Sequence, residues 1–190
     1  MSSRRVGAET SQTRALLLDT AELLMIEQGY AEISYRKVAS AAGVTPALVQ
    51  YYFPALDDLF VALVRRRTEE SLAKLERAFA TRSPLRVVYD YARDPRGAAL
   101  TAELHALANH RKVIAAELAS GGEQVRRLAL TALDGTAHHL GDDDVSSEVL
   151  VFMMTALPRM LVMEGAVGMK TSLAETSAFL KRFLDRVEPR

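Results

Sequence analysis

The stretch SYRKVASAAGVTPALVQYYFPALDDLFVAL, residues 34–63, decides the fold of this chain. It has the pattern of short helices joined by a tight turn. Ser34 and Thr45 are N-cap residues, and Gly43 lies between them, where a turn favours a residue without a side chain. The stretch predicts a helix-turn-helix, a unit that places its second helix, here residues 45–51, in the major groove of DNA.

The rest of the chain predicts more helices. Apolar residues recur at three- and four-residue spacing, and no run alternates with period two, so the expected class is all-α. The expected helices cover about residues 13–28, 34–42, 45–51, 57–80, 84–91, 96–109, 111–140, 146–164 and 172–187. Gly29 is expected to end the first helix in the left-handed conformation. Gly121-Gly122 kinks, loosens or splits the segment around it, and Ser172 with Glu175 predicts a capping box.

Composition limits the classes of function. The chain has 190 residues, of which 49% are hydrophobic, with 24 basic and 24 acidic side chains and no cysteine. Zero net charge excludes a generic polybasic binder, so any contact with DNA depends on local charge. Absent cysteine excludes disulfides, thiolate metal sites and a thiol nucleophile. Residues 1–12 lack the apolar run of a signal peptide, and the apolar stretch 149–163 is shorter than the roughly 20 residues of a membrane span. We therefore expect a soluble, cytoplasmic protein without a membrane partner.

A wider string of residues resembles a known family. Arg14, Leu17, Ala21, Gly29-Tyr30, Ser34, Val38-Ala39, Ala42-Gly43-Val44 and Tyr52-Phe53 agree in order and spacing with the DNA-binding domain of TetR-family transcriptional regulators. This resemblance implies a helix-turn-helix DNA-binding domain at residues 1–55 and a helical effector-binding and dimerisation domain at residues 56–190. It further implies a homodimeric repressor that leaves a palindromic operator when an unknown small molecule binds.

The expected DNA contacts divide into two groups. The full set is Ser34, Arg36, Lys37, Thr45, Pro46, Leu48, Gln50, Tyr51 and Tyr52. Ser34, Arg36 and Lys37 are expected at phosphates or the groove edge, and Tyr52 matches a family position that commonly touches phosphate. The third helix offers its side chains to base edges, where Gln50 can pair with adenine and Leu48 can contact a thymine methyl. Arg4 and Arg5 either track a groove or belong to a solvated tail.

Two departures from the family keep a second hypothesis open. Leu56 stands where the family usually has a lysine, and residues 1–55 hold equal numbers of basic and acidic side chains. The alternative is a helical ligand-binding or scaffold protein that no longer binds DNA specifically. An enzyme is not expected, because the chain has no nucleophile elbow, phosphate loop or nucleotide fingerprint.

The second domain offers candidates for a pocket and an interface. Tyr89, His105, Met153, Met154 and Arg159 are candidates for the ligand pocket, although a core position is the commoner role of a histidine like His105. Leu150, Leu157, Phe179, Leu180 and Phe183 are candidates for the dimer interface, which is expected to be a four-helix bundle of the last two helices. Arg159 either anchors an acidic ligand, pairs across the dimer with Glu164 or Asp185, or extends to the surface.

Neither a cofactor nor a metal is expected. His138-His139 with Asp142, Asp143 and Asp144 has the composition of a metal cluster. Adjacent histidines point to different faces of a helix, however, and successive aspartates are ordinary loop and capping residues.

Overall fold

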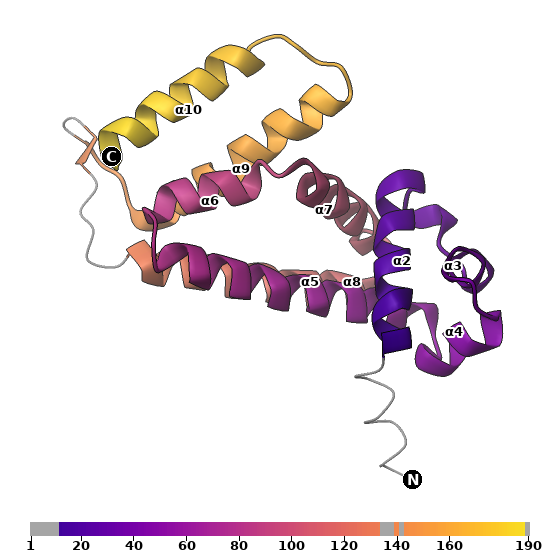
Figure 1. Ribbon diagram of the computed structural model, residues 1–190. Helices are drawn as coiled ribbons and strands as arrows, with labels where there is room; N and C mark the ends of the chain where they lie inside the picture. The colour runs from indigo at the N-terminus through magenta and orange to yellow at the C-terminus, as the bar shows by residue number, and fades with distance from the viewer. Residues whose placement is uncertain (1–11, 134–138, 141–142, 189–190) are drawn as a thin grey trace. The chain divides into compact units, whose positions relative to one another are not determined.

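The protein is built almost entirely of helices (Figure 1). The structure, a computed structural model, describes residues 12–133, 139–140 and 143–188. Its elements are α2 (Gln12–Gln28), η1 (Tyr30–Glu32, one 3-10 turn), α3 (Tyr35–Ala42), α4 (Pro46–Tyr52), α5 (Leu56–Phe79), α6 (Pro84–Ala92), α7 (Pro95–Ala108), α8 (Lys112–Leu133), β1 (His139–Leu140), β2 (Asp143–Asp144), α9 (Ser147–Ala166) and α10 (Leu173–Val187). The all-α prediction is confirmed, and β1 and β2 add only a two-residue antiparallel pairing among the described residues.

The predicted ends of the helix-turn-helix are confirmed. The Ser34 hydroxyl oxygen accepts a hydrogen bond from the Lys37 N–H at 3.3 Å, and the Thr45 hydroxyl oxygen accepts one from the Leu48 N–H at 3.3 Å. Each bond satisfies an N–H at a helix start that has no partner within the helix. Gly43 ends α3 in the left-handed conformation at φ 68° and ψ 32°, which a side chain would make strained.

At two other helix ends the predicted position is confirmed, but the predicted cap is wrong. Gly29 has a positive φ of 89°, but its ψ of 157° is extended, so it leads the chain into η1 and is no left-handed helical cap. Ser172 has φ 66° and makes no capping hydrogen bond through its side chain, so the predicted capping box with Glu175 does not form. A box needs an extended serine, because only then does the hydroxyl point toward the following N–H groups.

The long predicted segment with two adjacent glycines is one helix. α8 runs without a break through Gly121 and Gly122, so the pair does not split it. α8 is described as far as Leu133, and residues 139–140 form β1, so the expected helix end at residue 140 is wrong. Of the histidines and aspartates with the composition of a metal cluster, His138 and Asp142 lie outside the described residues. Arg4 and Arg5 lie outside them as well.

The described helices divide into two compact units. The first contains the chain up to Arg67 together with Leu100–Gly121, and the second contains Thr68–Ala99 together with the chain from Gly122 onward. Three helices, α5, α7 and α8, have residues in both units. The division between the glycines of α8 coincides with the interruption in its sequence pattern. These packing units differ from the functional domains expected at residues 1–55 and 56–190, which stay a prediction.

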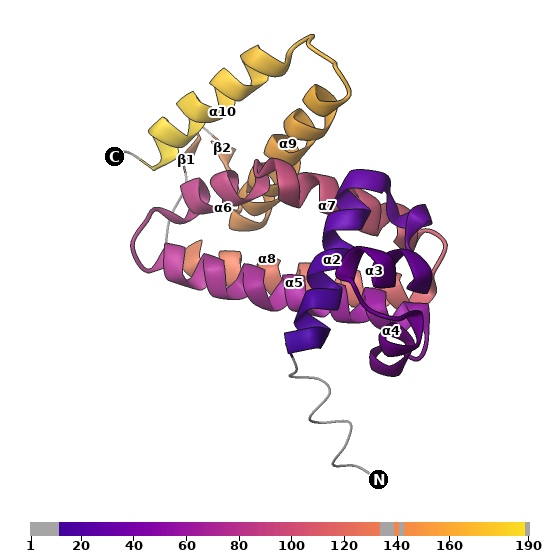
Figure 2. The same cartoon turned by 45° about the vertical axis from the view of Figure 1, so that its right-hand side comes forward.

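Each unit has its own apolar core. In the first unit α2, α3, α4 and the start of α5 bury a cluster that includes Leu17, Met25, Val49 and Leu59, and Ile114 of α8 joins it. Figure 2 shows α3 beside α2, with α4 at its end. In the second unit α6 packs along α9, and α10 turns back beside α9 (Figure 1). That core is completed by residues of α8.

The helix α9 agrees with the helix expected at about residues 146–164. It has 20 residues and, by length and composition alone, is apolar enough to cross a membrane. Its buried residues, however, are Leu150, Val151, Met154 and Pro158, of which the first three belong to the core of the second unit. The helix therefore has one face in a protein core and a second apolar face outside it.

Candidate nucleic-acid interface

The helix-turn-helix is held from within by small and β-branched side chains. Val38 and Ala39 of α3 are 0% and 1% exposed, and Val49 of α4 is 0% exposed. Ala39 lets the two helices approach closely, and Val49 fills the space between them. Phe53, which follows α4, is 1% exposed and lies under the Arg14 guanidinium at 5.3 Å, so it belongs to the core of the first unit.

The outward face of α4 carries the residues expected to meet base edges. Thr45, Pro46, Gln50 and Tyr51 are exposed, while Leu48 and Tyr52 are half-buried. Tyr51 is 59% exposed, although its ring contacts that of Tyr52 edge-to-face at 5.4 Å. Because Val49 holds the opposite face in the core, these side chains project together from one side of a fixed helix. The arrangement is suited to entering a groove, as a recognition helix does.

The expected phosphate contacts lie at the start of α3. Ser34 and Arg36 are exposed, whereas Lys37 is half-buried. The Lys37 Nζ lies 3.0 Å from the Glu32 Oε2, so this ammonium has a carboxylate partner before any phosphate arrives. The Ser34 oxygen accepts the Lys37 N–H, which leaves its O–H proton available to a phosphate oxygen. Arg36 is therefore the stronger candidate for a sequence-independent contact.

A tyrosine fixes the turn between α4 and α5. The Tyr35 hydroxyl lies within hydrogen-bond distance of the carbonyl oxygens of Phe53 and Pro54, at 2.9 and 3.0 Å. Burial raises the pKa of Tyr35, and the charges of Asp58 and Asp57 raise it further. The phenol therefore keeps its proton and remains a donor, so the turn after α4 stays closed. No sequence pattern had pointed to Tyr35.

The beginning of α5 is engaged with the protein itself. Leu56, at the position where a lysine was expected, packs against the first core. The Asp58 carboxylate accepts the Ala55 N–H at 2.8 Å, and Asp57 pairs with Arg111 of α8. An N–H already bonded to a carboxylate is not available to a phosphate. Leu56, which replaces the lysine usual in the family, therefore lies at the start of a helix whose polar groups already bond within the protein.

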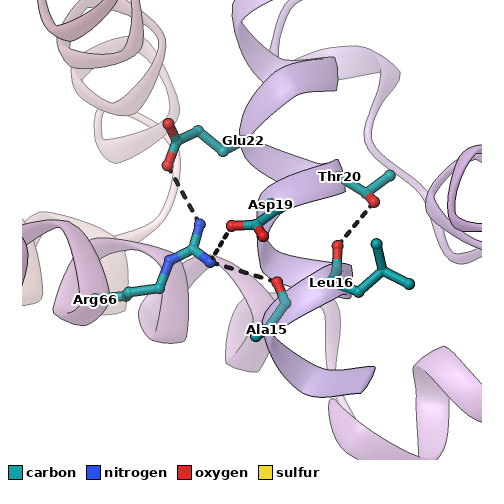
Figure 3. Close-up of polar contacts among 6 residues, drawn as sticks. All are labelled: Ala15, Leu16, Asp19, Thr20, Glu22 and Arg66. Carbon is teal, nitrogen blue, oxygen red and sulfur yellow. Dashed lines mark hydrogen bonds and ion pairs between the residues drawn. The ribbon is translucent and has the colours of Figure 1, made fainter. Parts of the chain in front are cut away.

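Two of the three acidic residues of α2, Asp19 and Glu22, pair with Arg66 of α5. Arg66 Nη1 lies 2.6 Å from Asp19 Oδ1, and Arg66 Nη2 lies 3.3 Å from Glu22 Oε2 (Figure 3). The same guanidinium donates to the Ala15 carbonyl oxygen at 3.4 Å. Arg66 lies outside residues 1–55, so the balanced count of charges over that range omits a cation that pairs with two of its acidic side chains. The Lys37–Glu32 pair removes one charge of each sign and leaves the balance unchanged. The balanced count therefore does not show that the exposed face of α3 and α4 is neutral.

α7 also contributes to the first unit. The Glu103 carboxylate accepts the Tyr30 N–H at 2.8 Å, and it lies 3.5 Å from the position that a Cβ on Gly29 would occupy. A bond between residues 73 positions apart closes the turn after α2 with a side chain from a much later helix. Gly29 is needed there for its positive φ.

The predicted pocket residues fall into different places. Tyr89, Met153 and Met154 belong to or pack against the core of the second unit, with Tyr89 6% and Met154 0% exposed. Arg159 is half-buried in the same unit, and burial lowers the pKa of its guanidinium. The structure thus brings four of the five predicted residues into one unit.

His105 does not join them. It lies in the first unit and is exposed, with its Nδ1 atom 2.8 Å from the Thr101 carbonyl oxygen. The expectation of a core histidine is therefore wrong. The apolar residues Leu104 and Leu107 beside it are buried, but successive residues of a helix are rotated by about 100°, so His105 points away from their core.

The predicted interface residues also divide. Leu150, Leu180 and Phe183 are 0%, 0% and 5% exposed, and all three belong to the core of the second unit. For these three the prediction of a partner contact is corrected, because a side chain buried in its own protomer has no surface to offer. Leu157 and Phe179 are 38% and 51% exposed and stay candidates.

Sequence reasoning missed three exposed apolar residues on α9. Val149, Phe152 and Met160 are 48%, 56% and 50% exposed. Positions 149, 152 and 160 share one helix face, and the buried Leu150, Met154 and Pro158 share another. The spacing itself held this signal: when two opposite faces of a helix are both apolar, one of them needs a second partner.

Comparison with known proteins shows a sequence match within the N-terminal part of the first unit. Residues 17–63 match the family model described as "Bacterial regulatory proteins, tetR family". A curated relative, the HTH-type transcriptional regulator AcrR of Shigella flexneri, is 30% identical over 82 residues, which are 43% of this chain and 38% of that protein. The match thus spans well under half of that relative.

Solved structures extend the likeness in fold to nearly the whole chain. A putative transcriptional regulator from Saccharomonospora viridis in complex with choline has a TM-score of 0.75 at 17% identity, covering 93% of this chain and 97% of that chain. A putative TetR-family transcriptional regulator from Rhodococcus sp. has a TM-score of 0.74 at 18% identity, covering 93% and 99%. At such identities the likeness concerns the fold alone.

Proposed function

We propose that this chain belongs to the tetR family of bacterial regulatory proteins, whose family model residues 17–63 match, and that it is a sequence-specific DNA-binding transcriptional regulator. The specific form of the proposal is a homodimeric repressor, acting in the cytoplasm, that leaves a palindromic operator when a small molecule binds. No catalytic step is assigned to it.

One observation carries this proposal. α4 holds Val49 completely buried while Gln50 and Tyr51 on its other side are exposed, and Arg36 of the adjoining helix α3 is exposed as well. Side chains of this kind, fixed on a capped helix beside a cation, combine base readout with a phosphate contact. A helix whose only role was structural would not need exposed tyrosine and glutamine together on its outer face.

The test is selection of bound duplexes from a random DNA pool, repeated at two salt concentrations. We expect a palindromic motif that is still selected at the higher salt concentration. Its half-sites should lie about one helical turn apart, because the two DNA-binding domains (heads) of a dimer are related by a two-fold axis and read inverted repeats. A pool that stays random, or binding that disappears with modest salt, would leave only electrostatic contact and remove the regulator proposal.

Gln50→Ala is expected to relax base preference at one position of each half-site. An amide that pairs bidentately with adenine contributes roughly 1–3 kcal/mol of discrimination against other bases. The measurement is a competition assay with operators that carry each base at every position. If all positions keep their preference, Gln50 does not read a base, and the contacts of α4 have been misassigned.

Arg36→Ala is expected to weaken binding to all sequences alike. Removal of one phosphate contact lowers the slope of log affinity against log salt by about 0.9, so a dimer with two heads should show a decrease of about 2. The measurement is a salt titration with the selected operator and with a scrambled duplex. Lys37→Ala is the matched comparison and should have the smaller effect, because Lys37 already pairs with Glu32.

Dimerisation is assigned to the exposed apolar face of α9 together with Phe179 of α10. Val149, Phe152, Leu157 and Met160 of α9 and Phe179 are all at least 38% exposed. Exposed apolar patches of this kind mark sites of protein association. The dimer proposed from the sequence keeps its two helices, but its interface residues shift to the exposed side of α9.

The effector is proposed to act through α5. This helix is continuous from Leu56 to Phe79 and has residues in both units. A ligand bound in the second unit is expected to change the spacing of the two heads in the dimer. Distance measurements between spin labels on the two copies of α4 test this directly. An effector that weakens DNA binding while that distance stays fixed would overturn the spacing mechanism.

The second candidate, a helical ligand-binding protein without specific DNA binding, is favoured by the start of α5. There Leu56 replaces the expected lysine and the Ala55 N–H is bonded to Asp58. The same selection experiment separates the candidates, since this second protein would enrich no motif.

A further inference from the structure

An unpaired positive charge lies on an otherwise apolar stretch of α9. Arg159 is the only charged residue between Val149 and Met163. Its side chain is half-buried, and within the described part of the chain it takes part in no hydrogen bond and no ion pair. Removing a charged group from water is unfavourable unless a partner compensates it. A half-buried guanidinium is only partly hydrated, so a bound anion would compensate the part of its charge that water does not.

The groups that act on Arg159 electrostatically do not supply that anion. They are Tyr91 of α6 and Arg126 of α8. The Tyr91 hydroxyl donates to the Ser71 hydroxyl oxygen of α5 at 3.0 Å. Arg126 adds a second positive charge to the same unit, and burial together with this charge lowers the pKa of the Arg159 guanidinium. Four helices of the second unit thus contribute hydroxyl and guanidinium groups here.

Arg126 is itself only weakly compensated. Its guanidinium lies 3.8 Å from the Glu123 carboxylate one turn earlier on α8, and both side chains are about half exposed. It also lies over the Phe152 ring of α9 at 5.6 Å. An exposed pair at this distance contributes little energy, so Arg126 remains able to attract a second anion.

The apolar neighbours of Arg159 limit the kind of anion. Val162 and Met163, three and four residues further along α9, are half-buried and share its helix face. A small hydrated anion would gain nothing from them, whereas an amphipathic anion would place its apolar part against them. A quaternary ammonium would be repelled by two guanidiniums.

We infer that Arg159 is the anchor of the effector site and that the effector is an amphipathic organic carboxylate, with Arg126 as a second positive charge. The planar guanidinium matches a carboxylate through two parallel hydrogen bonds. This inference rests on the proposed function and deepens it by naming the class of ligand that the second unit binds. The alternative is an ion pair across the dimer with Glu164, since Asp185 already pairs with Arg86 of its own chain.

The experiment uses three probes with one alkyl chain and different head groups: octanoate, octanol and octylammonium. Each is titrated by calorimetry into the full-length protein and into Arg159→Met, which keeps a long side chain but removes the charge. Arg159→Lys keeps the charge but removes the planar guanidinium that makes two parallel hydrogen bonds. Arg127→Met is the matched control, because it removes an exposed arginine adjacent to Arg126 on α8.

We expect octanoate to bind the unaltered protein at least tenfold more tightly than octanol, and octylammonium to bind more weakly than either. Arg159→Met should weaken octanoate by about tenfold or more and leave octanol unchanged, because a charge-assisted hydrogen bond is removed. Arg159→Lys should retain part of the preference, and Arg127→Met all of it.

Two results would overturn the inference. One is octanoate binding no more tightly than octanol to the unaltered protein. The other is Arg159→Met retaining the carboxylate preference; dissociation of this variant to monomers in sedimentation would then identify the pair with Glu164. Failure of the proposed function is separate: a protein that prefers octanoate but enriches no DNA motif keeps its carboxylate site and loses its role as a regulator. A protein that enriches a DNA motif but binds octanoate no more tightly than octanol keeps its role as a regulator and loses the proposed carboxylate site.

Discussion

Arg66→Met should destabilise the first unit by about 3 kcal/mol, the range found when one partner of a buried ion pair is removed. The Glu22 side chain is only 8% exposed and that of Arg66 only 19%, so the substitution leaves a carboxylate shielded from water beside a methionine (Figure 3). Urea unfolding followed by circular dichroism measures the change, and the transition of the first unit should move to lower denaturant.

A double variant separates the charge from the packing. Arg66→Met combined with Glu22→Gln should recover most of the lost stability, because the buried charge is then absent on both sides. Asp19→Asn alone should cost less than about 1 kcal/mol, since the Asp19 side chain is 69% exposed and its pair with Arg66 is screened by water. Equal losses from Arg66→Met and the double variant would show that Arg66 acts by packing.

The same ion pair matters for function because of where Arg66 lies. It is the next-to-last residue of α5 that belongs to the first unit, and α5 continues into the second. It ties Asp19 and Glu22 of α2 to the helix through which an effector is proposed to act. Arg66→Met should therefore also weaken the response of DNA binding to the effector.

The helix-turn-helix was predictable because its information is local. Ser34, Gly43 and Thr45 act on groups within three or four residues, and their caps formed as expected. Ser172 shows the limit of that reasoning. The motif Ser172 to Glu175 was present, but the chain enters α10 through a positive φ, which depends on how the preceding loop returns from α9.

The long-range hydrogen bonds were not predictable from spacing. The bond between Glu103 and the Tyr30 N–H joins positions whose separation in sequence carries no periodic signal. The same holds for Glu188, whose carboxylate accepts the N–H groups of Leu85 and Arg86 at 2.9 and 3.1 Å and caps α6 from the far end of the chain. Only a folded backbone brings such groups together, and their residue types are ordinary on any surface.

The proposed dimer interface is an intermediate case. The sequence pointed to α9 and α10, and the structure adds which of their apolar side chains are buried in the chain's own core and which are exposed. Phe179 and Phe183 are one turn apart, with ring centroids 6.4 Å apart, yet they are 51% and 5% exposed. Both are apolar, so composition cannot tell which one faces the protomer's own core and which faces a partner.

Phe152→Glu is accordingly expected to convert the dimer to monomers that remain folded. Phe152 is 56% exposed in the single chain, and in a two-fold interface each substitution occurs twice. Burial of one phenylalanine contributes about 1.5–3 kcal/mol, so the loss of two should raise the dimer dissociation constant at least about a hundredfold. Sedimentation velocity over a range of concentrations gives the constant, and circular dichroism checks that helix content is unchanged.

Two further substitutions make the result specific to that face. Phe183→Glu places a carboxylate in the core of the second unit, so it should cost more than about 4 kcal/mol and unfold that unit rather than release intact monomers. Leu23→Glu alters an apolar residue of α2 that is 43% exposed, outside the proposed interface, and should leave the dimer unchanged. Because the Arg126 guanidinium lies over the Phe152 ring at 5.6 Å and is able to pair with the new carboxylate, Phe152→Lys is measured beside Phe152→Glu, and a dimer that survives both substitutions would place the interface elsewhere.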